Sequence, residues 1–148
     1  MNNEKIRIFS KILGILFVSS YLLNFIWESI HAVLLYEGHN IPVYDYFIMM
    51  SYVSTIDGLL IVIIYLIISL ILKDLFWMKK LENAGIYLFA FVGVVIAAII
   101  EFDALYLRHK WHYNALMPTV LGLGISPLLQ LSITGILNVL IVKRLLKL

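Results

Sequence analysis

Long apolar stretches separated by short charged segments divide the chain into four parts. The stretches cover about 12–36, 46–72, 84–107 and 125–142. A helix needs ~20 residues to cross the ~30 Å hydrocarbon layer of a membrane, and the first three stretches have that length. The fourth needs the glycine-containing approach before Pro127, and a proline suits the first turn of a helix because its missing N–H would be unpaired there. The pattern predicts four transmembrane helices.

Strands would explain the same stretches poorly. A transmembrane barrel alternates apolar and polar residues along each strand, whereas residues 61–68 are apolar or aromatic throughout. A helix pairs its own backbone groups and needs no partner strand in lipid. The first stretch is also longer than the core of a secretory signal and shows no clear small-residue cleavage site. We therefore predict an all-α, polytopic membrane bundle that forms a single transmembrane domain over residues 1–148.

The amino-acid composition is typical of a protein in lipid and argues against several classes of function. Hydrophobic residues make up 63% of the chain and charged residues 14%, whereas a soluble domain has about a quarter charged residues. The net charge of +2 is too small to indicate nucleic-acid binding. The chain has no cysteine, which excludes disulfides and thiol catalysis. We predict no cofactor.

The basic residues predict how the bundle is oriented. Of the eleven Lys and Arg residues, only Arg108 and Lys110 follow the first or third stretch. Positive charge accumulates on the cytoplasmic side of membrane proteins. We therefore predict a multi-pass protein of the cell membrane with both termini and the middle loop in the cytoplasm (N-in, C-in). The nine residues that indicate this are Lys5, Arg7, Lys11, Lys73, Lys79, Lys80, Lys143, Arg144 and Lys147.

Three carboxylic acids, Glu28, Asp57 and Glu101, lie deep within the apolar stretches, whereas a fourth, Asp103, lies near the outer end of the third stretch and is explained by the interface. A carboxylate in hydrocarbon costs at least ~2.5–3.5 kcal/mol and therefore usually marks a functional site. At a rise of 1.5 Å per residue, all three lie ~24–26 Å from the inner boundary, in the outer third of the layer. Gln130 falls at ~20 Å by the same count. The sequence thus predicts one polar cluster near the outer face.

The polar residues near Glu28 in the sequence suggest two roles, helix–helix hydrogen bonding and metal binding. Asn24, Glu28 and His31 follow one another at spacings of four and three, which places them on one helix face. Asn24, with Thr134 and Asn138, is adequately explained by hydrogen bonds that hold membrane helices together. The Glu-x-x-His spacing also occurs in di-metal carboxylate bundles, but here it occurs once, and we predict no metal site.

The segment before the fourth stretch has a different character. Residues 108–114 are polar and aromatic, as expected at the outer membrane interface, where Trp111 and Tyr113 would be anchors. Residues 117–124 are apolar and glycine-rich but too short to span. They either lie in the interface or form a re-entrant segment over the polar cluster, where non-helical backbone needs protein or a water-filled cavity around it.

Several short motifs resemble known families. One group resembles a family of uncharacterised prokaryotic four-helix membrane proteins, which supplies no known activity; it comprises Asn24-Phe25-Ile26-Trp27-Glu28, Leu35-Tyr36, Glu101, Trp111-His112-Tyr113, Met117-Pro118 and Ser126-Pro127-Leu128-Leu129-Gln130. The Asn-x-x-Trp-Glu element alone is similar to one in integral-membrane terpene cyclases, in which a membrane-embedded acid protonates an isoprenoid olefin or epoxide. That resemblance implies that Glu28 is a proton donor and that Glu101 or Asp57 is a partner acid.

The leading functional hypothesis is an intramembrane acid/base enzyme, or a binder, for an apolar isoprenoid- or lipid-like molecule. Glu28 would be the acid, His31 its orienting or proton-relay partner, and Glu101 and Asp57 further carboxyls. The alternatives are a proton- or ion-conducting homo-oligomer, or an accessory subunit without catalysis. The substrate-binding residues that we predict, with Trp27 and Trp111 as pocket walls, are Asn24, Trp27, Trp111, Tyr113 and Gln130.

Overall fold

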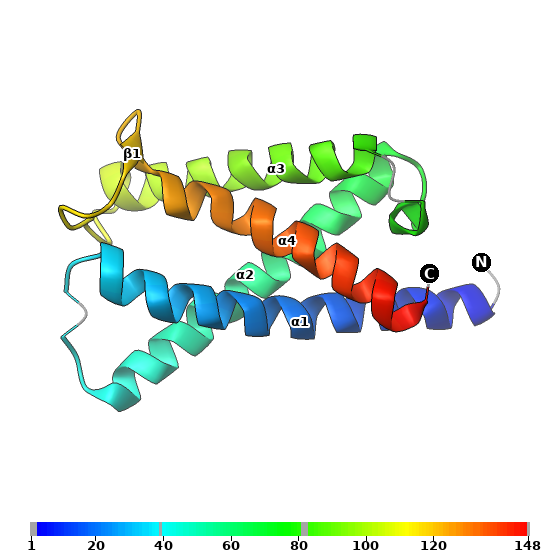
Figure 1. Cartoon of the computed structure of the whole chain (residues 1–148), viewed down its shortest axis with the longest axis horizontal. Helices are drawn as coiled ribbons and strands as arrows, with labels where there is room; N and C mark the ends of the chain where they lie inside the picture. The colour runs from blue at the N-terminus through cyan, green and yellow to red at the C-terminus, as the bar shows by residue number, and fades with distance from the viewer. Residues whose placement is uncertain (1–2, 39, 81–82, 148) are drawn as a thin grey trace.

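Four helices make up most of the computed structural model, which describes residues 3–38, 40–80 and 83–147. They are α1 (Asn3–Leu35), α2 (Val43–Ile71), α3 (Asn83–Phe102) and α4 (Ile125–Leu146) (Figure 1). Each is long and apolar enough to cross a membrane, with α3 counted together with the turn that continues it to Leu107. The predicted all-α four-helix bundle is confirmed, and the chain has the plan of a multi-pass membrane protein.

Helix boundaries differ from the prediction mainly at the start of α1. This helix begins at Asn3, not near residue 12, because Lys and Arg are good helix formers and the helix continues past the apolar stretch. α4 begins at Ile125 with Pro127 in its first turn, as predicted. α3 continues into a π-helical turn, η2 (Asp103–Leu107), in which the N–H of Arg108 bonds to the carbonyl of Asp103.

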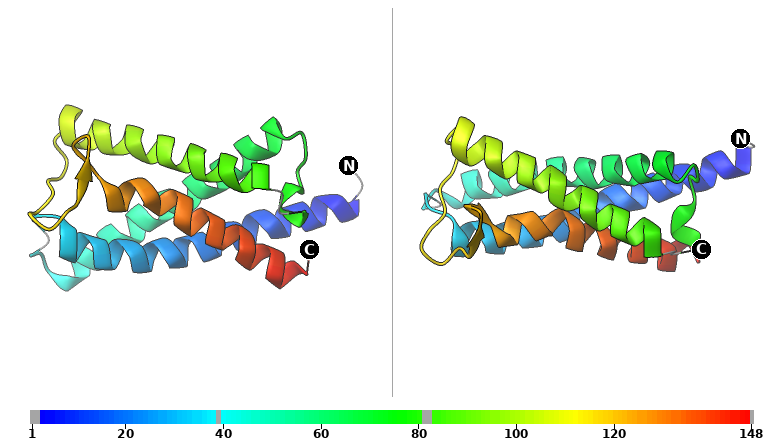
Figure 2. Two further views of the ribbon diagram at one scale, coloured as in Figure 1. Left: turned by 45° about the horizontal axis from the view of Figure 1, so that its top comes forward. Right: turned by 90° about the horizontal axis from the view of Figure 1, so that it is seen from above.

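The helices pack in two pairs that cross. α1 lies mainly against α2, α3 lies mainly against α4, and α4 also packs on α1. α2 runs diagonally behind α4, so that it approaches α3 at one end of the bundle and diverges from it at the other (Figures 1 and 2). Both termini and η1 (Trp77–Lys79) lie at the first end, which we call the termini end. The other end, called the hairpin end, carries the α1–α2 connection and a short β-hairpin.

Apolar and polar side chains are distributed as expected for a protein in lipid. The core toward the termini end is apolar and aromatic, with the rings of Tyr65, Trp77 and Phe89 in contact. Buried polar residues occur in every helix. The outer surfaces carry large apolar side chains, for example Val18, Leu22, Ile26 and Ile30 on α1 and Phe91, Val95 and Ile99 on α3.

The glycine-rich segment before α4 is non-helical, as predicted, and folds into an antiparallel hairpin. Its strands are β1 (Thr119–Val120) and β2 (Leu123–Gly124). Leu121 at the tip is 97% exposed, whereas the buried side chain of Met117 lies against Gly124 at the base. The base of the hairpin therefore packs on the bundle, and at its tip the Tyr106 hydroxyl of η2 donates a hydrogen bond of 3.2 Å to the Gly122 carbonyl oxygen.

Candidate functional site

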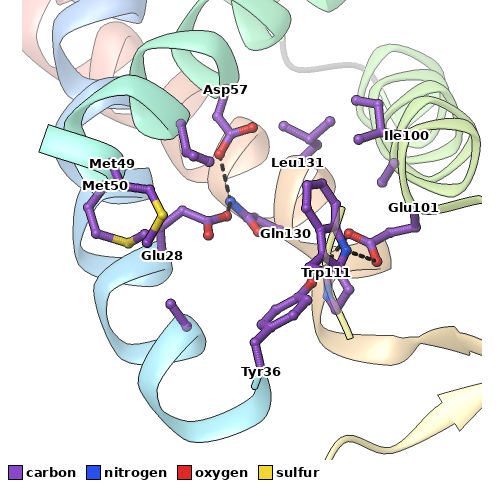
Figure 3. A pocket seen from close by; sticks show the side chains of 14 residues that line it. Glu28, Tyr36, Met49, Met50, Asp57, Ile100, Glu101, Trp111, Gln130 and Leu131 are labelled. Atoms are coloured by element: carbon purple, nitrogen blue, oxygen red, sulfur yellow. Dashed lines mark hydrogen bonds between the residues drawn. The ribbon is translucent and has the colours of Figure 1, made fainter. Parts of the chain in front are cut away.

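A cavity of about 160 Å³ lies among the four helices near the hairpin end (Figure 3). It occupies the region where α2 and α3 diverge, and Ile100 on its α3 side is 37% exposed at the molecular surface. Most of its wall is apolar, but three carboxyl groups and one amide also reach it. The lining residues are Glu28, Ala32, Tyr36, Met49, Met50, Val53, Asp57, Ala97, Ile100, Glu101, Trp111, Pro127, Gln130 and Leu131.

Gln130 of α4 joins polar side chains from α1 and α2. Its Nε2 lies 2.6 Å from Oε1 of Glu28, 2.9 Å from Oδ2 of Asp57 and 3.1 Å from Oδ1 of Asn24. Figure 3 shows the Glu28 and Asp57 side chains meeting at this amide from two different helices. The arrangement ties three helices together at a single nitrogen atom.

The closeness of two carboxyl groups at this amide indicates that the pair holds a proton. An amide nitrogen carries two N–H groups, but three oxygens lie within hydrogen-bonding distance of Gln130 Nε2. Two ionised carboxylates held this close repel each other, and one of such a pair normally keeps its proton. A proton on Glu28 or Asp57 removes this repulsion. The pair is therefore arranged as an acid that can donate a proton into the cavity.

Asn24 is held from behind by a short chain of polar groups. It is fully buried, and its Nδ2 donates to the Ser20 carbonyl oxygen at 2.9 Å. Its Oδ1 also accepts from the Thr134 hydroxyl at 3.2 Å. Asn24 does not line the cavity, so its role is to fix Gln130 and thereby the two acids. These contacts agree with the structural role predicted for Asn24 and Thr134, whereas the direct substrate contact also predicted for Asn24 is not seen, because its side chain lies behind Gln130.

Glu101 of α3 lies on the opposite wall and accepts three hydrogen bonds. Tyr36 donates to Oε1 at 3.3 Å, and Trp111 and Tyr113 both donate to Oε2, the indole nitrogen at 3.4 Å. An ionised carboxylate only accepts hydrogen bonds, so three donors suit its charged form. The rings of Tyr36 and Trp111 meet edge to face with 6.2 Å between centroids. This wall thus combines aromatic rings with a buried carboxyl group that accepts three hydrogen bonds.

The donors to Glu101 come from segments just outside the membrane-spanning helices. Tyr36 follows α1 and forms a bridge with Tyr113, whose hydroxyl also accepts from the Gly124 N–H at 2.9 Å. Burial raises the pKa of both phenols, and the neighbouring Glu101 raises them further. Both hydroxyls therefore remain protonated donors at neutral pH. They also fasten the base of the hairpin to the cavity wall.

The structure brings together most of the predicted site and separates two residues from it. Glu28, Asp57, Glu101, Gln130 and Trp111 line one cavity, with Asn24 and Tyr113 directly behind them. Trp27 and His31 instead line a groove between α1 and α4. The predicted pairing of His31 with Glu28 is wrong, because neither ring nitrogen of His31 has a hydrogen-bond partner among the described residues. The side chain turns toward α4, and its ring packs on Tyr36.

Sequence reasoning missed two features of the cavity. Tyr36 stands at the end of the first apolar stretch, where an aromatic residue usually anchors the interface, and only the fold shows that it reaches Glu101. Met49 and Met50 form the α2 side of the wall, but methionines in an apolar helix give no distinguishing pattern. Within the described ranges, no cluster of three or more His, Asp or Glu side chains is arranged to hold a metal ion.

Comparison with known proteins gives no family for the chain. No protein-family model, curated protein or solved structure matches it significantly. The resemblances noted from short motifs therefore stay predictions, and the interpretation of the site rests on its geometry.

Proposed function

We propose that the cavity is an intramembrane acid–base site that binds part of an apolar, isoprenoid-like molecule and transfers a proton to it. The observation that carries this proposal is the placement of Glu28 and Asp57 on one amide nitrogen, at 2.6 and 2.9 Å, in an otherwise apolar wall. A carboxylic acid in a dry site keeps its proton at neutral pH, because burial disfavours the charged form, and it is therefore available as a general acid.

The geometry supports a proton-in, proton-out sequence across the cavity. Glu28 or Asp57 gives its proton to one carbon of a carbon–carbon double bond, and the neighbouring carbon becomes a cation. Loss of a proton from an adjacent carbon to the now ionised Glu28–Asp57 pair re-forms a double bond at a new position. One proton enters and one leaves, so the net reaction is an isomerisation and the acid is regenerated.

The opposite wall is suited to the cationic intermediate. Aromatic faces attract cations within about 6 Å of the ring centroid, and the rings of Tyr36 and Trp111 lie on this side. Glu101 adds a negative charge held by three donors. A charge fixed in this way stabilises a developing positive charge without having to reorganise.

The size and position of the cavity limit the substrate. A volume of about 160 Å³ is below the ~300–1,000 Å³ of typical ligand pockets. It suits the reacting segment of a molecule whose remainder extends into the bilayer. Ile100 at the rim is partly exposed on the lipid-facing side, which gives an apolar substrate a route from the membrane between α2 and α3.

We further propose that the protein resides in the cell membrane with its termini in the cytoplasm, which places the cavity in the outer half. The support is the position of the basic residues. The segments that hold nine of the eleven Lys and Arg residues lie at the termini end, whereas Arg108 and Lys110 lie at the hairpin end. Cytoplasmic segments carry the excess of positive charge.

Solvent-deuterium labelling tests the proton transfer whichever lipid is the substrate. The purified full chain is reconstituted with a total lipid extract in D2O, and the lipids are analysed by mass spectrometry. We expect a lipid to gain deuterium at carbon in the presence of the wild-type protein. Glu28→Gln should slow this labelling at least ~100-fold, the usual contribution of a general acid.

The matched control is Glu37→Gln, the same chemical change at an exposed residue just beyond α1. It should label lipid at the wild-type rate. Equal labelling by Glu28→Gln and the wild type would contradict the proposal. Labelling lost only because Glu28→Gln no longer inserts or purifies would assign Glu28 a structural role instead.

The structure favours this proposal over proton or ion conduction through one bundle. Beyond Asn138, the termini end is filled by Ile12, Ile64, Ile68 and Val142, each fully buried. A conducting path needs polar groups or water along its length. This tightly packed apolar region would block such a path, and it suits a cavity that opens to one side of the membrane only.

A further inference from the structure

The charged groups that line the acid cavity are all of one sign. Glu28, Asp57 and Glu101 bring carboxyl groups to its wall, and none of its lining residues is Lys, Arg or His. Arg108 and Lys110, the basic residues of the hairpin end, are not among them. A buried carboxylate needs either a proton or a positively charged partner. No described side chain in the cavity wall supplies that partner.

Glu28 and Asp57 each keep one oxygen atom for a ligand. Gln130 bonds to Oε1 of Glu28 and to Oδ2 of Asp57. The second oxygen of each carboxyl group accepts no hydrogen bond from the described residues. Both side chains are partly exposed and line the cavity, as Figure 3 shows. A ligand inside the cavity can therefore donate a hydrogen bond to whichever of the two acids is ionised.

The opposite wall offers a surface for a positive charge. Tyr36 and Trp111 line the cavity, and their rings meet edge to face with 6.2 Å between centroids. Both side chains donate hydrogen bonds to Glu101, which lies directly behind them. Aromatic faces attract cations, and proteins commonly bind ammonium groups with aromatic side chains. The cavity thus has hydrogen-bond acceptors on one side and aromatic rings beside a carboxyl group on the other.

The same groups argue against a metal ion and against a phosphate. Gln130 turns its nitrogen toward Glu28 and Asp57, and N–H groups would repel a metal ion, which needs oxygen ligands there. A phosphate would meet three carboxyl groups and no basic lining residue. The rest of the wall is largely apolar, and Ile100 is partly exposed where α2 and α3 diverge. These features fit an organic cation at the end of a hydrocarbon chain.

We propose that the acid cavity binds the protonated amino group of a lipophilic amine without a phosphate, which rests on the proposed function in taking the same cavity as the binding site but needs no proton transfer. The ammonium N–H donates to the second oxygen of Glu28 or Asp57, and the carbon atoms next to the nitrogen lie on the rings of Tyr36 and Trp111. A volume of about 160 Å³ holds the amino group and its first carbons. The hydrocarbon chain passes Ile100 into the bilayer. The bound amine occupies the place of the cationic intermediate and therefore blocks the proton transfer.

Competition binding tests the proposal with the wild-type protein. The purified full chain is placed in phosphatidylcholine nanodiscs, and binding of radiolabelled dodecyldimethylamine is measured against protein-free nanodiscs at neutral pH. We expect saturable binding. Unlabelled amine should compete at least ~10 times better than its hydrocarbon isostere, in which CH replaces the nitrogen, or than dodecyl phosphate, because a hydrogen bond to a charged group contributes at least that factor. Binding that does not saturate, or equal competition by either compound, would overturn the proposal.

A pair of double variants locates the site. Glu28→Gln combined with Asp57→Asn removes both acidic acceptors with little change of shape, and it should weaken amine binding at least ~10-fold. The matched control is Glu37→Gln combined with Asp45→Asn, which makes the same two chemical changes at exposed residues of the hairpin end. It should bind the amine as the wild type does. Wild-type affinity in the first variant would also overturn the proposal, and the competition series decides the matter if that variant fails to fold.

Solvent-deuterium labelling of lipids separates this proposal from the proposed function. The wild-type protein is assayed with and without saturating amine, which should stop the labelling. Saturable amine binding without any labelling by the wild type would reject proton transfer and leave the amine site standing. Labelling without saturable amine binding, or labelling unchanged by saturating amine, would overturn the amine site and leave proton transfer standing.

Discussion

At the scale of single residues, Gln130 is the side chain on which the candidate site most depends. Its Nε2 is shared by Glu28, Asp57 and Asn24, which belong to two other helices. We expect Gln130→Leu to lower the free energy of unfolding by ~2 kcal/mol, since interhelical hydrogen bonds in membranes contribute ~0.6 kcal/mol each on average. Unfolding by SDS titration of the detergent-solubilised protein measures the change.

Ser132→Ala provides the comparison on the same helix. The Ser132 hydroxyl donates an interhelical hydrogen bond of 2.7 Å to the Ala90 carbonyl oxygen, and it lies on the α3 side, away from the acids. Its loss should lower stability by only ~0.6 kcal/mol. If the two variants were equally stable, Gln130 would not be the point that holds the acids together.

Tyr36 provides a prediction about alkaline pH. Burial and the nearby Glu101 raise the pKa of its phenol above the ordinary value of about 10. Above pH 10 the unfolded chain loses this proton while the folded chain keeps it, so the stability of the folded state falls as pH rises. Each such group contributes up to ~1.4 kcal/mol per pH unit. Tyr36→Phe should therefore lose stability less steeply than the wild type between pH 10 and 11 in unfolding titrations.

Tyr44→Phe is the reference for that measurement. Tyr44 is 74% exposed at the start of α2 and lies far from the buried wall around Glu101 in the chain. Its pH profile should follow that of the wild type. A Tyr36→Phe profile that did the same would mean that the phenol is not held neutral against Glu101.

At the scale of elements, the contact between α3 and α4 depends on glycine. A Cβ atom on Gly93 would lie 2.8 Å from the Ser132 hydroxyl and 3.1 Å from the backbone nitrogen of the same residue. Backbone cannot move aside as a flexible side chain can. We expect Gly93→Ala to separate the two helices and to destabilise the protein by ~1–3 kcal/mol, the usual cost of overpacking. Gly14→Ala is the control, because nothing lies within 4 Å of its added Cβ.

The helices were largely predictable from the sequence, because long apolar stretches in lipid leave little choice but a helix. The start of α1 was not predictable, because the apolar pattern marks only the part of a helix that lies in lipid. A helix that contains Lys and Arg can continue beyond that part into water. The grouping of Glu28, Asp57 and Glu101 followed from depth alone. The direction of His31 did not, because helix spacing places Glu28 and His31 on one face but does not show which neighbour each side chain meets. Tyr36 and the hairpin depend on long-range contacts that no local pattern contains.

At the scale of the whole molecule, the two ends of the bundle have different physical characters. The termini end is packed with apolar side chains and bears most of the positive charge. The hairpin end holds the acid cavity and the aromatic wall around Glu101. In the proposed orientation, the tightly packed termini end lies at the cytoplasmic surface. The hairpin end suits a site that receives molecules from the outer half of the bilayer.

The proposed orientation can be tested sharply because the chain contains no native cysteine. Lys110→Cys at the hairpin end and Arg144→Cys near the end of α4 each introduce one thiol at an exposed position. In intact cells, a membrane-impermeant maleimide should modify the Lys110→Cys variant and leave the Arg144→Cys variant unmodified. Permeabilised cells should give equal labelling of both, which shows that each thiol is reactive. The reverse pattern in intact cells would place the termini outside and the acid cavity in the inner half of the membrane.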